Sequence, residues 1–190
     1  EQARSGKYET IILDHASGLQ DLVLKEILGL EQLPAQKGWG LASMATWGQC
    51  TQICKDILRD LIGLPCNVVV LAQERVFNTK EDGVQSEVIS PTIGAGLTPS
   101  LAGWLAPAVD YVCQTFIRQR EKVISTTYGQ GKLAKVVESI EKIPNEVDYC
   151  LRTAPSHEVI TKFRIPKGRL LPTWIVDPSY AKIMDLISGV

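Results

Sequence analysis

Long hydrophobic runs are missing from this sequence. No apolar stretch approaches the roughly 18 residues of a membrane-spanning helix, and residues 1–5 have no signal-peptide character. The five cysteines form no Cys-x-x-Cys pair, and the two histidines are isolated, so no metal-binding spacing is present. These absences predict a protein without a membrane span, located in the reducing cytoplasm with its thiols free and buried.

An excess of charge of either sign is also missing. The chain has 20 Lys and Arg against 21 Asp and Glu, so its net charge is −1. A wholly basic surface for nucleic acid is therefore excluded, and any such contact must be local to particular loops. The 190 residues, 45% hydrophobic and 22% charged, predict one soluble globular domain over residues 1–190.

The first feature that is present is a short apolar strand that ends in a carboxylate. Residues 8–14 end in Ile11-Ile12-Leu13-Asp14, a run typical of strands buried on both faces of a parallel sheet. Ligands bind outside the carboxyl ends of such strands, so Asp14 is expected at the edge of a ligand crevice. A carboxylate there can hold Mg²⁺ through the ion's own waters. The alternative is that Asp14 only starts a turn before a helix.

Two helices and a second strand follow. Ser17 and Gln20 have capping-box spacing and predict a helix that Gly29 ends, and periodicity predicts a long helix over residues 42–62. Residues 67–73 form a second β-branched apolar run, which ends in Gln73. This order of elements predicts a layered α/β fold with right-handed crossovers. The predicted core residues are Leu19, Leu22, Val23, Ile27 and Leu28 in the first helix and Met44, Trp47, Cys50 or Thr51, Cys54, Ile57, Leu58 and Leu61 in the second.

Two segments lack periodicity. Residues 31–40 contain Lys37 and, between two glycines, Trp39. The tryptophan either folds back onto the core or lies in a loop that presents both side chains to a single nucleic-acid strand. Residues 74–98 form an aperiodic stretch of about 25 residues, which is rare in a compact domain unless it is functional. We expect a functional loop there, held by a following short helix.

The last part of the chain is predicted mainly as strands. We expect a strand over 108–117, a helix or an exposed hairpin arm over 128–141, antiparallel strands over 146–152 and 158–164 joined at 154–156, and a closing helix with Asp177 as its cap and Pro178 at its first position. Lys162 and Arg164 are two apart on a predicted strand, so both project from one face. Solvated surface charges are the plain interpretation of this pair.

The order of these motifs resembles the RecA-like branch of P-loop ATPases, specifically phage nucleotide-binding proteins of the recombination or single-strand annealing type. Residues 10–19 look like the Walker B strand, residues 38–42 and the next helix like the first DNA-binding loop, residues 68–73 like the strand with the phosphate-sensing glutamine, residues 74–98 like the second DNA loop, and residues 106–112 and 151–164 like the closing strands. The resemblance implies a RecA-like P-loop NTPase core. Such a core has a mostly parallel twisted sheet flanked by helices, with antiparallel strands toward the C-terminus. The location would be the host cytoplasm if a phage encodes the protein.

The resemblance also implies roles for individual residues. ATP and Mg²⁺ would be the cofactors, with Asp14 holding the metal through water and Gln73 contacting the γ-phosphate; the plain interpretation of Gln73 is a polar residue that ends a strand. Lys162 and Arg164 would reach the ATP of a neighbouring subunit, like arginine fingers, which implies a homo-oligomeric ring or filament. Single-stranded DNA would be bound by Lys37, Trp39, Arg75 and Lys80.

One motif of that family is missing. The sequence contains no Gly-x-x-x-x-Gly-Lys-[Ser/Thr], and the nearest imitation, at residues 129–133, lacks the first glycine and the hydroxyl after the lysine. In the family this loop precedes the Walker B strand. We therefore expect the chain to be the later part of a longer protein, and not to bind ATP tightly alone.

Three functions stay open. The first is an ATP-dependent recombination or annealing ATPase core that assembles on single-stranded DNA. The second is a non-catalytic DNA-binding or assembly protein with a vestigial nucleotide site. The third, a Rossmann-like small-molecule enzyme, is disfavoured because no Gly-x-Gly-x-x-Gly follows a strand.

Overall fold

The computed structural model describes residues 5–31, 42–79, 90–128, 135–165, 168 and 170–188. The backbone forms two compact units, the first made of residues 1–110 and 157–160 and the second of residues 111–156 and 161–190. That residues 1–190 are one domain stays a prediction. Within the described residues, no helix has the length and apolar character that a membrane crossing requires.

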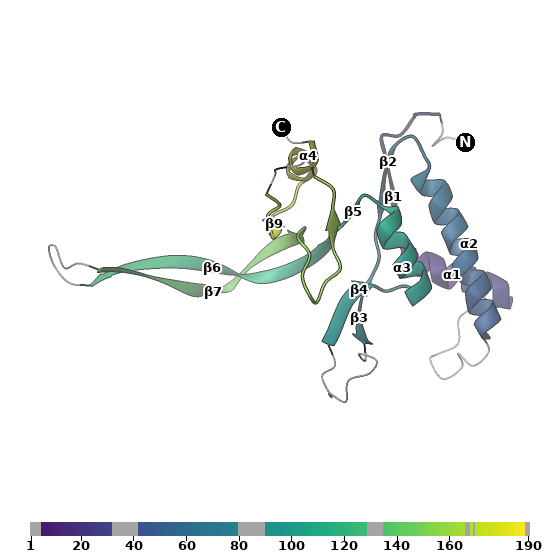
Figure 1. Cartoon of the computed structure of the whole chain (residues 1–190), viewed down its shortest axis with the longest axis horizontal. Coiled ribbons are helices and arrows are strands. Elements are labelled where there is room, and N and C mark those ends of the chain that lie inside the picture. Colours follow the sequence, from purple (N-terminus) through teal and green to yellow (C-terminus); the bar gives the residue numbers. More distant parts are fainter. Residues whose placement is uncertain are drawn as a thin grey trace. The chain divides into compact units, whose positions relative to one another are not determined.

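In the described residues, the first unit combines three helices with two small sheets (Figure 1). Its elements are β1 (Thr10–Leu13), α1 (Ala16–Leu28), α2 (Met44–Ile62), β2 (Asn67–Val70), β3 (Glu74–Thr79), β4 (Ser90–Ala95) and α3 (Pro99–Ala108).

The strands β1 and β2 pair in parallel. Their register runs from Thr10 opposite Asn67 to Leu13 opposite Val70, with α1 and α2 between them in the sequence. A parallel pair needs a crossover connection, and the two helices supply it. The predicted order of strand, two helices and parallel strand is confirmed.

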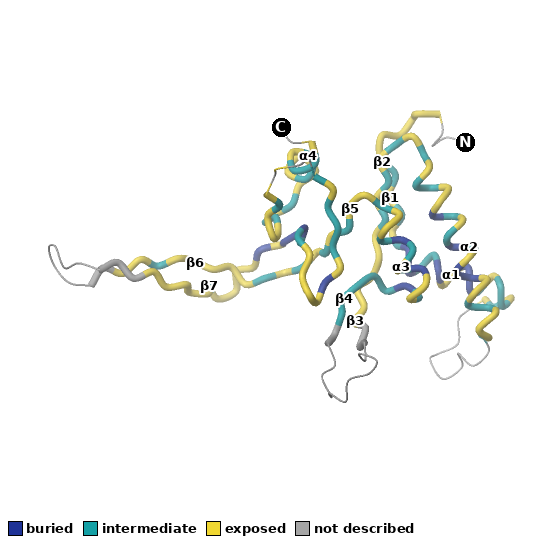
Figure 2. Tube along the Cα trace, in the orientation of Figure 1, coloured by how far each residue is buried: buried dark blue, intermediate teal, exposed yellow. Residues whose placement is uncertain are grey.

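One face of this sheet is open, which corrects the prediction that both faces are buried. Leu13 and Val70 pack against the helical core, whereas Ile12 and Val69 on the other face are 61% and 41% exposed. The unbroken apolar runs indicated burial on both sides, but among the described residues the helices contact only one side. The alternating burial along both strands is visible in Figure 2.

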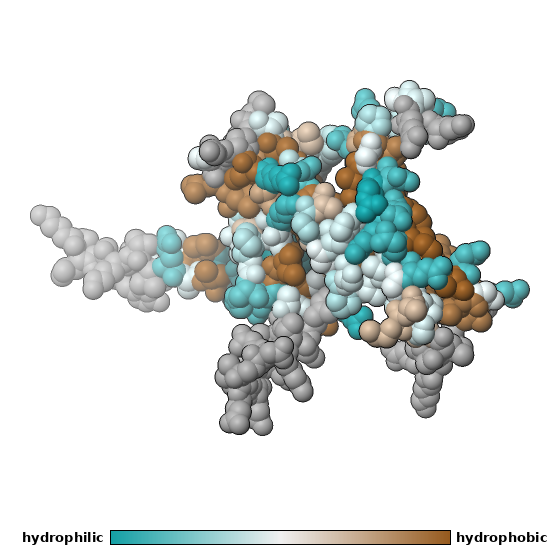
Figure 3. Space-filling model, turned by 45° about the vertical axis from the view of Figure 1, so that its right-hand side comes forward, coloured by the Kyte–Doolittle hydropathy of each residue, from teal (hydrophilic) through white to brown (hydrophobic). Residues whose placement is uncertain are grey.

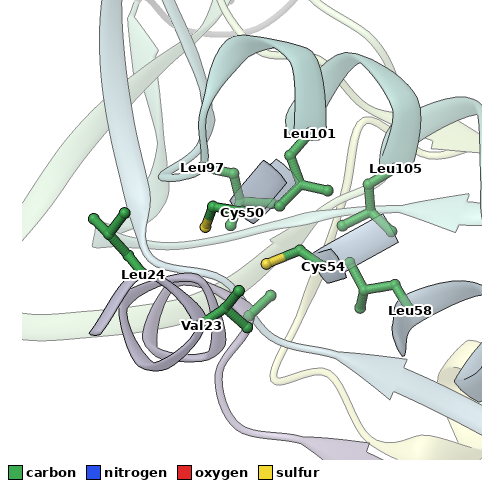
Figure 4. Close-up of a cluster of buried hydrophobic side chains, with 9 residues drawn as sticks. Val23, Leu24, Cys50, Cys54, Leu58, Leu97, Leu101 and Leu105 are labelled. Carbon is green, nitrogen blue, oxygen red and sulfur yellow. The ribbon is translucent and has the colours of Figure 1, made fainter. Parts of the chain in front are cut away.

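The core of the first unit lies where its three helices meet (Figure 4). It is formed by Ala16, Val23, Leu24, Cys50, Cys54, Leu58, Leu97, Leu101 and Leu105, each at most 8% exposed. The predicted core is confirmed for most positions. It is wrong for Leu22 and Met44, which are 63% and 92% exposed. Met44 is the first residue of its helix, where no neighbouring element reaches it among the described residues.

The cysteines are free, as predicted, but not all are buried. Cys50, Cys54 and Cys150 are buried, Cys66 is half-buried and Cys113 is exposed. Burial raises the pKa of the Cys54 thiol to about 12, with the neighbouring Cys50 adding to the shift. Burial likewise raises the pKa of Cys50. Thiols in this state are poor nucleophiles, so the pair serves packing.

Much of the segment predicted as a loop over residues 74–98 is an antiparallel hairpin. Its strands β3 and β4 pair from Glu74 opposite Ala95 to Thr79 opposite Ser90. Pro91 and Gly94 are poor strand formers, and they concealed the two-residue period of β4 in the sequence. Val159 forms a bridge with Ile93, which attaches residues 157–160 to this unit.

The second unit is built on a long antiparallel ribbon (Figure 1). Its elements are β5 (Tyr111–Val112), β6 (Gln114–Tyr128), β7 (Lys135–Arg152), β8 (Lys162–Phe163), β9 (Trp174–Val176) and α4 (Tyr180–Ser188). β6 pairs with β7 along nearly its whole length, and β9 adds a third strand only at residues 150–152. For residue 128 and residues 135–141 the open choice is therefore resolved in favour of the hairpin arm, whereas residues 129–134 lie outside the described residues.

Two strand assignments correct the sequence prediction. Ala108 ends α3, so the strand predicted over 108–117 begins only at Tyr111. The predicted hairpin between 146–152 and 158–164 does not form: β7 pairs with β6 and β9, and β8 pairs with β5. Beyond β7 the chain is held by residues 172 and 173, because Thr153 donates from its backbone N to Thr173 O and from its hydroxyl to Pro172 O.

The cap of α4 is Ser179 and not Asp177. The Ser179 hydroxyl accepts a hydrogen bond from Lys182 N at 3.3 Å. Asp177 has φ of 47°, which lies outside the extended region that a helix cap requires. Pro178 accordingly precedes the helix.

A cluster of ion pairs around the buried Asp148 joins the two strands of the ribbon. The Asp148 carboxylate accepts hydrogen bonds from Arg120 Nε at 2.7 Å and from Arg118 Nη2 at 3.1 Å. The hydrogen bond from Arg120 is the main reason that the pKa of Asp148 lies below its ordinary value. Arg120 also pairs with Glu146 at 3.0 Å. The cluster joins β6 to β7 near the base of the ribbon.

Candidate functional site

Asp14 and Gln73 lie at the same edge of the parallel sheet. Asp14 directly follows β1, and Gln73 comes three residues after β2. Because the strands are parallel and Leu13 lies opposite Val70, both chains leave the sheet at its carboxyl end. Leu71 N donates to Leu13 O at 3.0 Å and continues the pairing beyond the strands. Both side chains are exposed, so a ligand at this edge can reach them.

His15 caps the helix that begins beside Asp14. Its backbone is extended, with φ of −135° and ψ of 159°, and its Nδ1 accepts a hydrogen bond from Gly18 N at 2.9 Å. A nitrogen that accepts carries no proton, so the neutral ring holds its proton on Nε2. Ala16 N donates to Leu71 O at 2.7 Å, which fixes the start of α1 to the end of β2. His15 therefore has a structural role, as the cap of α1.

Ser17 and Gln20 do not form the predicted capping box. Both are buried, and they bind the backbone of other segments. Ser17 Oγ accepts from Gln73 N at 3.3 Å, and Gln20 Oε1 accepts from Thr98 N at 2.9 Å. Their spacing fitted a cap, but His15 already fills that position. The sequence did contain a sign of these contacts, because both polar side chains lie next to the apolar face of the helix.

Gln73 also forms the base of the β3–β4 hairpin. Gly96 N donates to Gln73 O at 2.6 Å, one residue outside the Glu74–Ala95 pair. A Cβ atom on Gly96 would lie 3.1 Å from Gln73 O, so the close approach requires glycine. The backbone of Gln73 thus connects the sheet edge, through Ser17 of α1, with the hairpin.

A hollow of about 400 Å³ lies next to Asp14. Its lining residues are Leu13, Asp14, His15, Gly18, Leu19, Asp21, Leu22 and Lys25. Among the described residues, no group of three His, Cys, Asp or Glu side chains could hold a metal ion. Mg²⁺ does not need such a group, because it keeps several waters and is bound by one or two carboxylates together with the phosphates of a nucleotide. That Asp14 holds Mg²⁺ here stays a prediction.

Comparison with known proteins identifies the family. Residues 2–165 match the family described as an AAA domain. The chain belongs to the AAA domain family. No curated protein and no solved structure shows a significant match. AAA domains are of the P-loop ATPase type, so the match supports nucleotide-binding ATPase activity, with ATP and Mg²⁺ as the usual cofactors of the family.

The part of the chain that matches the AAA domain contains all the candidate nucleotide- and DNA-binding residues named from the sequence. Lys162 is the first residue of β8, opposite Val112, and is half-buried, while Arg164 follows the strand and is exposed. Both belong to the second unit, whereas Asp14 and Gln73 belong to the first. Their action on a neighbouring subunit's nucleotide stays a prediction.

Of the four residues predicted to bind DNA, the structure describes one. Arg75 is exposed in β3, two residues after Gln73 and opposite Gly94. Lys37, Trp39 and Lys80 lie outside the described residues.

Proposed function

We propose that this AAA domain is the RecA-like ATPase core of a phage-type recombination or annealing protein that binds single-stranded DNA. Asp14 holds Mg²⁺ through water at the carboxyl end of β1. Gln73 donates from its side-chain amide to the γ-phosphate, and Arg75 at the base of the hairpin binds the DNA backbone.

The observation that carries the proposal is the tether at Gln73. Its backbone N donates to Ser17 and its backbone O accepts from Gly96. A shift of Gln73 on loss of the γ-phosphate therefore displaces the base of the β3–β4 hairpin. This links phosphate status to the DNA contact, as nucleotide switches link a phosphate to the ordering of a loop.

The cations Lys162 and Arg164 complete the proposed site in trans. In a ring or filament of identical subunits, they stabilise the charge that develops on the neighbour's ATP during hydrolysis. A variant of either residue would lose hydrolysis but keep nucleotide binding. Mixing it with subunits that have intact cations but a defective Asp14 would restore part of the activity.

The test uses the complete natural protein and measures ATP hydrolysis with and without single-stranded DNA. Asp14→Ala is expected to abolish hydrolysis, whereas Asp60→Ala, an exposed aspartate on α2, leaves it unchanged. Gln73→Ala is expected to bind ATP and DNA but to lose the effect of one on the other. The matched control is Gln49→Ala, an exposed glutamine on α2. Normal DNA-stimulated hydrolysis in Gln73→Ala would refute the sensor role.

A second function is favoured by the absence of the Gly-x-x-x-x-Gly-Lys-[Ser/Thr] motif from the 190 residues. In this alternative the chain is a non-catalytic DNA-binding or assembly protein with a vestigial nucleotide site. DNA binding without ATP binding, unchanged in Asp14→Ala, would select this function over the first.

A further inference from the structure

The ribbon of β6 and β7 has two different faces. On one face, which also carries the buried Asp148, Phe116 and Trp174 pack edge to face with ring centroids 6.3 Å apart. Successive residues of a strand point to opposite sides, so Ile117 and Tyr149 lie on the other face. They are directly opposite each other in the register and are 61% and 60% exposed.

The exposed face continues along the ribbon. Val147, opposite Gln119, is 43% exposed, and farther out Val123 and Ile140 face each other at 58% and 68% exposed. We refer to Ile117, Val123, Ile140, Val147 and Tyr149 together as the apolar stripe. Figure 2 colours most of the ribbon as exposed, and Figure 3 shows apolar side chains on the visible surface of the protein.

A free ribbon of this kind is not a stable arrangement by itself. Two-stranded hairpins are marginally stable in water, and β9 supports only residues 150–152 of β7. An apolar stripe along such an arm is typical of an interaction surface. The charges are balanced, because Glu121 lies opposite Lys142 and Lys122 opposite Glu141. A balanced arm offers nothing to attract nucleic acid or an anionic membrane, and it suits a protein partner.

Along β6, Glu121 lies an even number of residues from Ile117 and Val123, so its side chain points to the same side as theirs. The pairing with β7 shifts register between Gln119 and Glu121, and beyond the shift Glu121 lies opposite Lys142, between the inner and outer residues of the apolar stripe. We propose that the apolar stripe is the contact surface between two copies of this chain, with the twofold axis along the ribbon. This rotation places β6 of one copy over β7 of the other. Ile117 then meets Tyr149, Val123 meets Ile140, and Glu121 meets Lys142 of the second copy.

The charged row selects this axis. The other face-to-face twofold arrangement, with the axis across the strands at the same row, puts Glu121 against Glu121 and Lys142 against Lys142. Like charges brought together in an interface are strongly unfavourable. With the axis along the ribbon, Ile117 meets Tyr149, Val123 meets Ile140 and Glu121 meets its opposite charge Lys142, while Val147 meets Gln119. The contact uses none of the residues of the proposed nucleotide site, so it can be tested separately.

The first experiment measures the mass of the 190-residue chain in solution without nucleotide or DNA, from about 1 to 100 µM, the range that captures micromolar association. The wild type is expected to reach twice the 20.9 kDa of one chain. Val123→Asp and Ile140→Asp bury a charge in the contact and are expected to weaken the dimer more than about 100-fold. Thr126→Asp adds the same charge on the opposite face and is the matched control. A wild-type monomer at all concentrations, or a dimer in Val123→Asp, overturns the proposal.

The second experiment uses the charged row and does not depend on the stability of any one variant. Glu121→Lys and Lys142→Glu each place like charges across the axis, and each is expected to weaken its own dimer more than about tenfold. In a mixed dimer, the chain with Glu121→Lys has two positive charges in this row and the chain with Lys142→Glu has two negative charges. Each positive charge then lies over a negative charge of the partner. Mixed dimers are therefore expected to form preferentially. Two variants that dimerise no better together than apart overturn the arrangement.

Discussion

Replacing Gly96 by alanine tests the close approach at the base of the β3–β4 hairpin. The new Cβ would lie 3.1 Å from Gln73 O, 3.5 Å from the Gln73 carbonyl carbon and 3.6 Å from the Gln73 Cβ. These atoms belong to or adjoin the backbone of one residue. Relief therefore requires a shift of Gln73, which lengthens the 2.6 Å hydrogen bond from Gly96 N to Gln73 O.

The expected cost is about 1–3 kcal/mol of unfolding free energy, the usual range for an extra methyl group in a tightly packed place. For a protein of this size that corresponds to a fall in Tm of about 2–12 °C. Urea unfolding followed by circular dichroism gives the free energy, and a thermal scan gives Tm.

Two other glycines provide the control. A Cβ added to Gly48 in α2 or to Gly103 in α3 would have no atom of the described residues within 4 Å beyond its own stretch of helix, so it meets open space. Replacing either helical glycine by alanine is expected to raise the free energy of unfolding by about 0.5–1 kcal/mol, because alanine is the better helix former. The reasoning would be refuted if Gly96→Ala raised stability as the two helical variants do.

Three further outcomes are expected. Leu24→Ala empties a core position that is 1% exposed and should cost about 2–5 kcal/mol in urea unfolding, whereas Leu22→Ala, 63% exposed, should cost less than about 0.5 kcal/mol; equal costs would show that the core is assigned wrongly. The lowered pKa of Asp148 means that its ion pairs stabilise the fold fully above the ordinary Asp value of about 4 and progressively less as pH falls through the lower folded pKa. Asp148→Asn should flatten the loss of stability below that pH, while Glu138→Gln, on the exposed part of β7, should not. Cys54, whose pKa is raised to about 12, should resist thiol reagents at pH 8 until urea unfolds the protein, and labelling at the rate of a free thiol in the native state would contradict its burial.

The sequence predicted the parallel pair, and the edge that Asp14 and Gln73 share, well, because both depend on local patterns. The apolar runs before Asp14 and Gln73, the periodicity of residues 44–62 and the Gly29 stop are all visible without tertiary information. What could not be predicted depends on contacts between distant residues. The tethers from Ser17 to Gln73 and from Gln20 to Thr98 span 56 and 78 positions, and Ser17 was predicted as a cap because its spacing fits one.

The strands of the second unit were harder to predict for a different reason. Residues 114–128 and 135–152 carry charged and apolar side chains on both faces, so their alternation does not mark an inner and an outer side. The pairing of β7 with β6 and β9 leaves no edge for residues 158–164, and no local signal shows this in advance. The apolar stripe on the exposed side of the ribbon blurred the pattern further.

The two tethers of α1 also determine what can vary in the β3–β4 hairpin. One helix holds the chain where it enters the hairpin, at Gln73, and where it leaves towards α3, at Thr98. The alignment of the two strands is therefore set at the base of the hairpin, where Glu74 lies opposite Ala95. Sliding one strand past the other would break a contact with the helix. Residues can be added or removed in the connection between the strands without changing which residues pair, so this segment can be exchanged while the edge at Asp14 and Gln73 keeps its form.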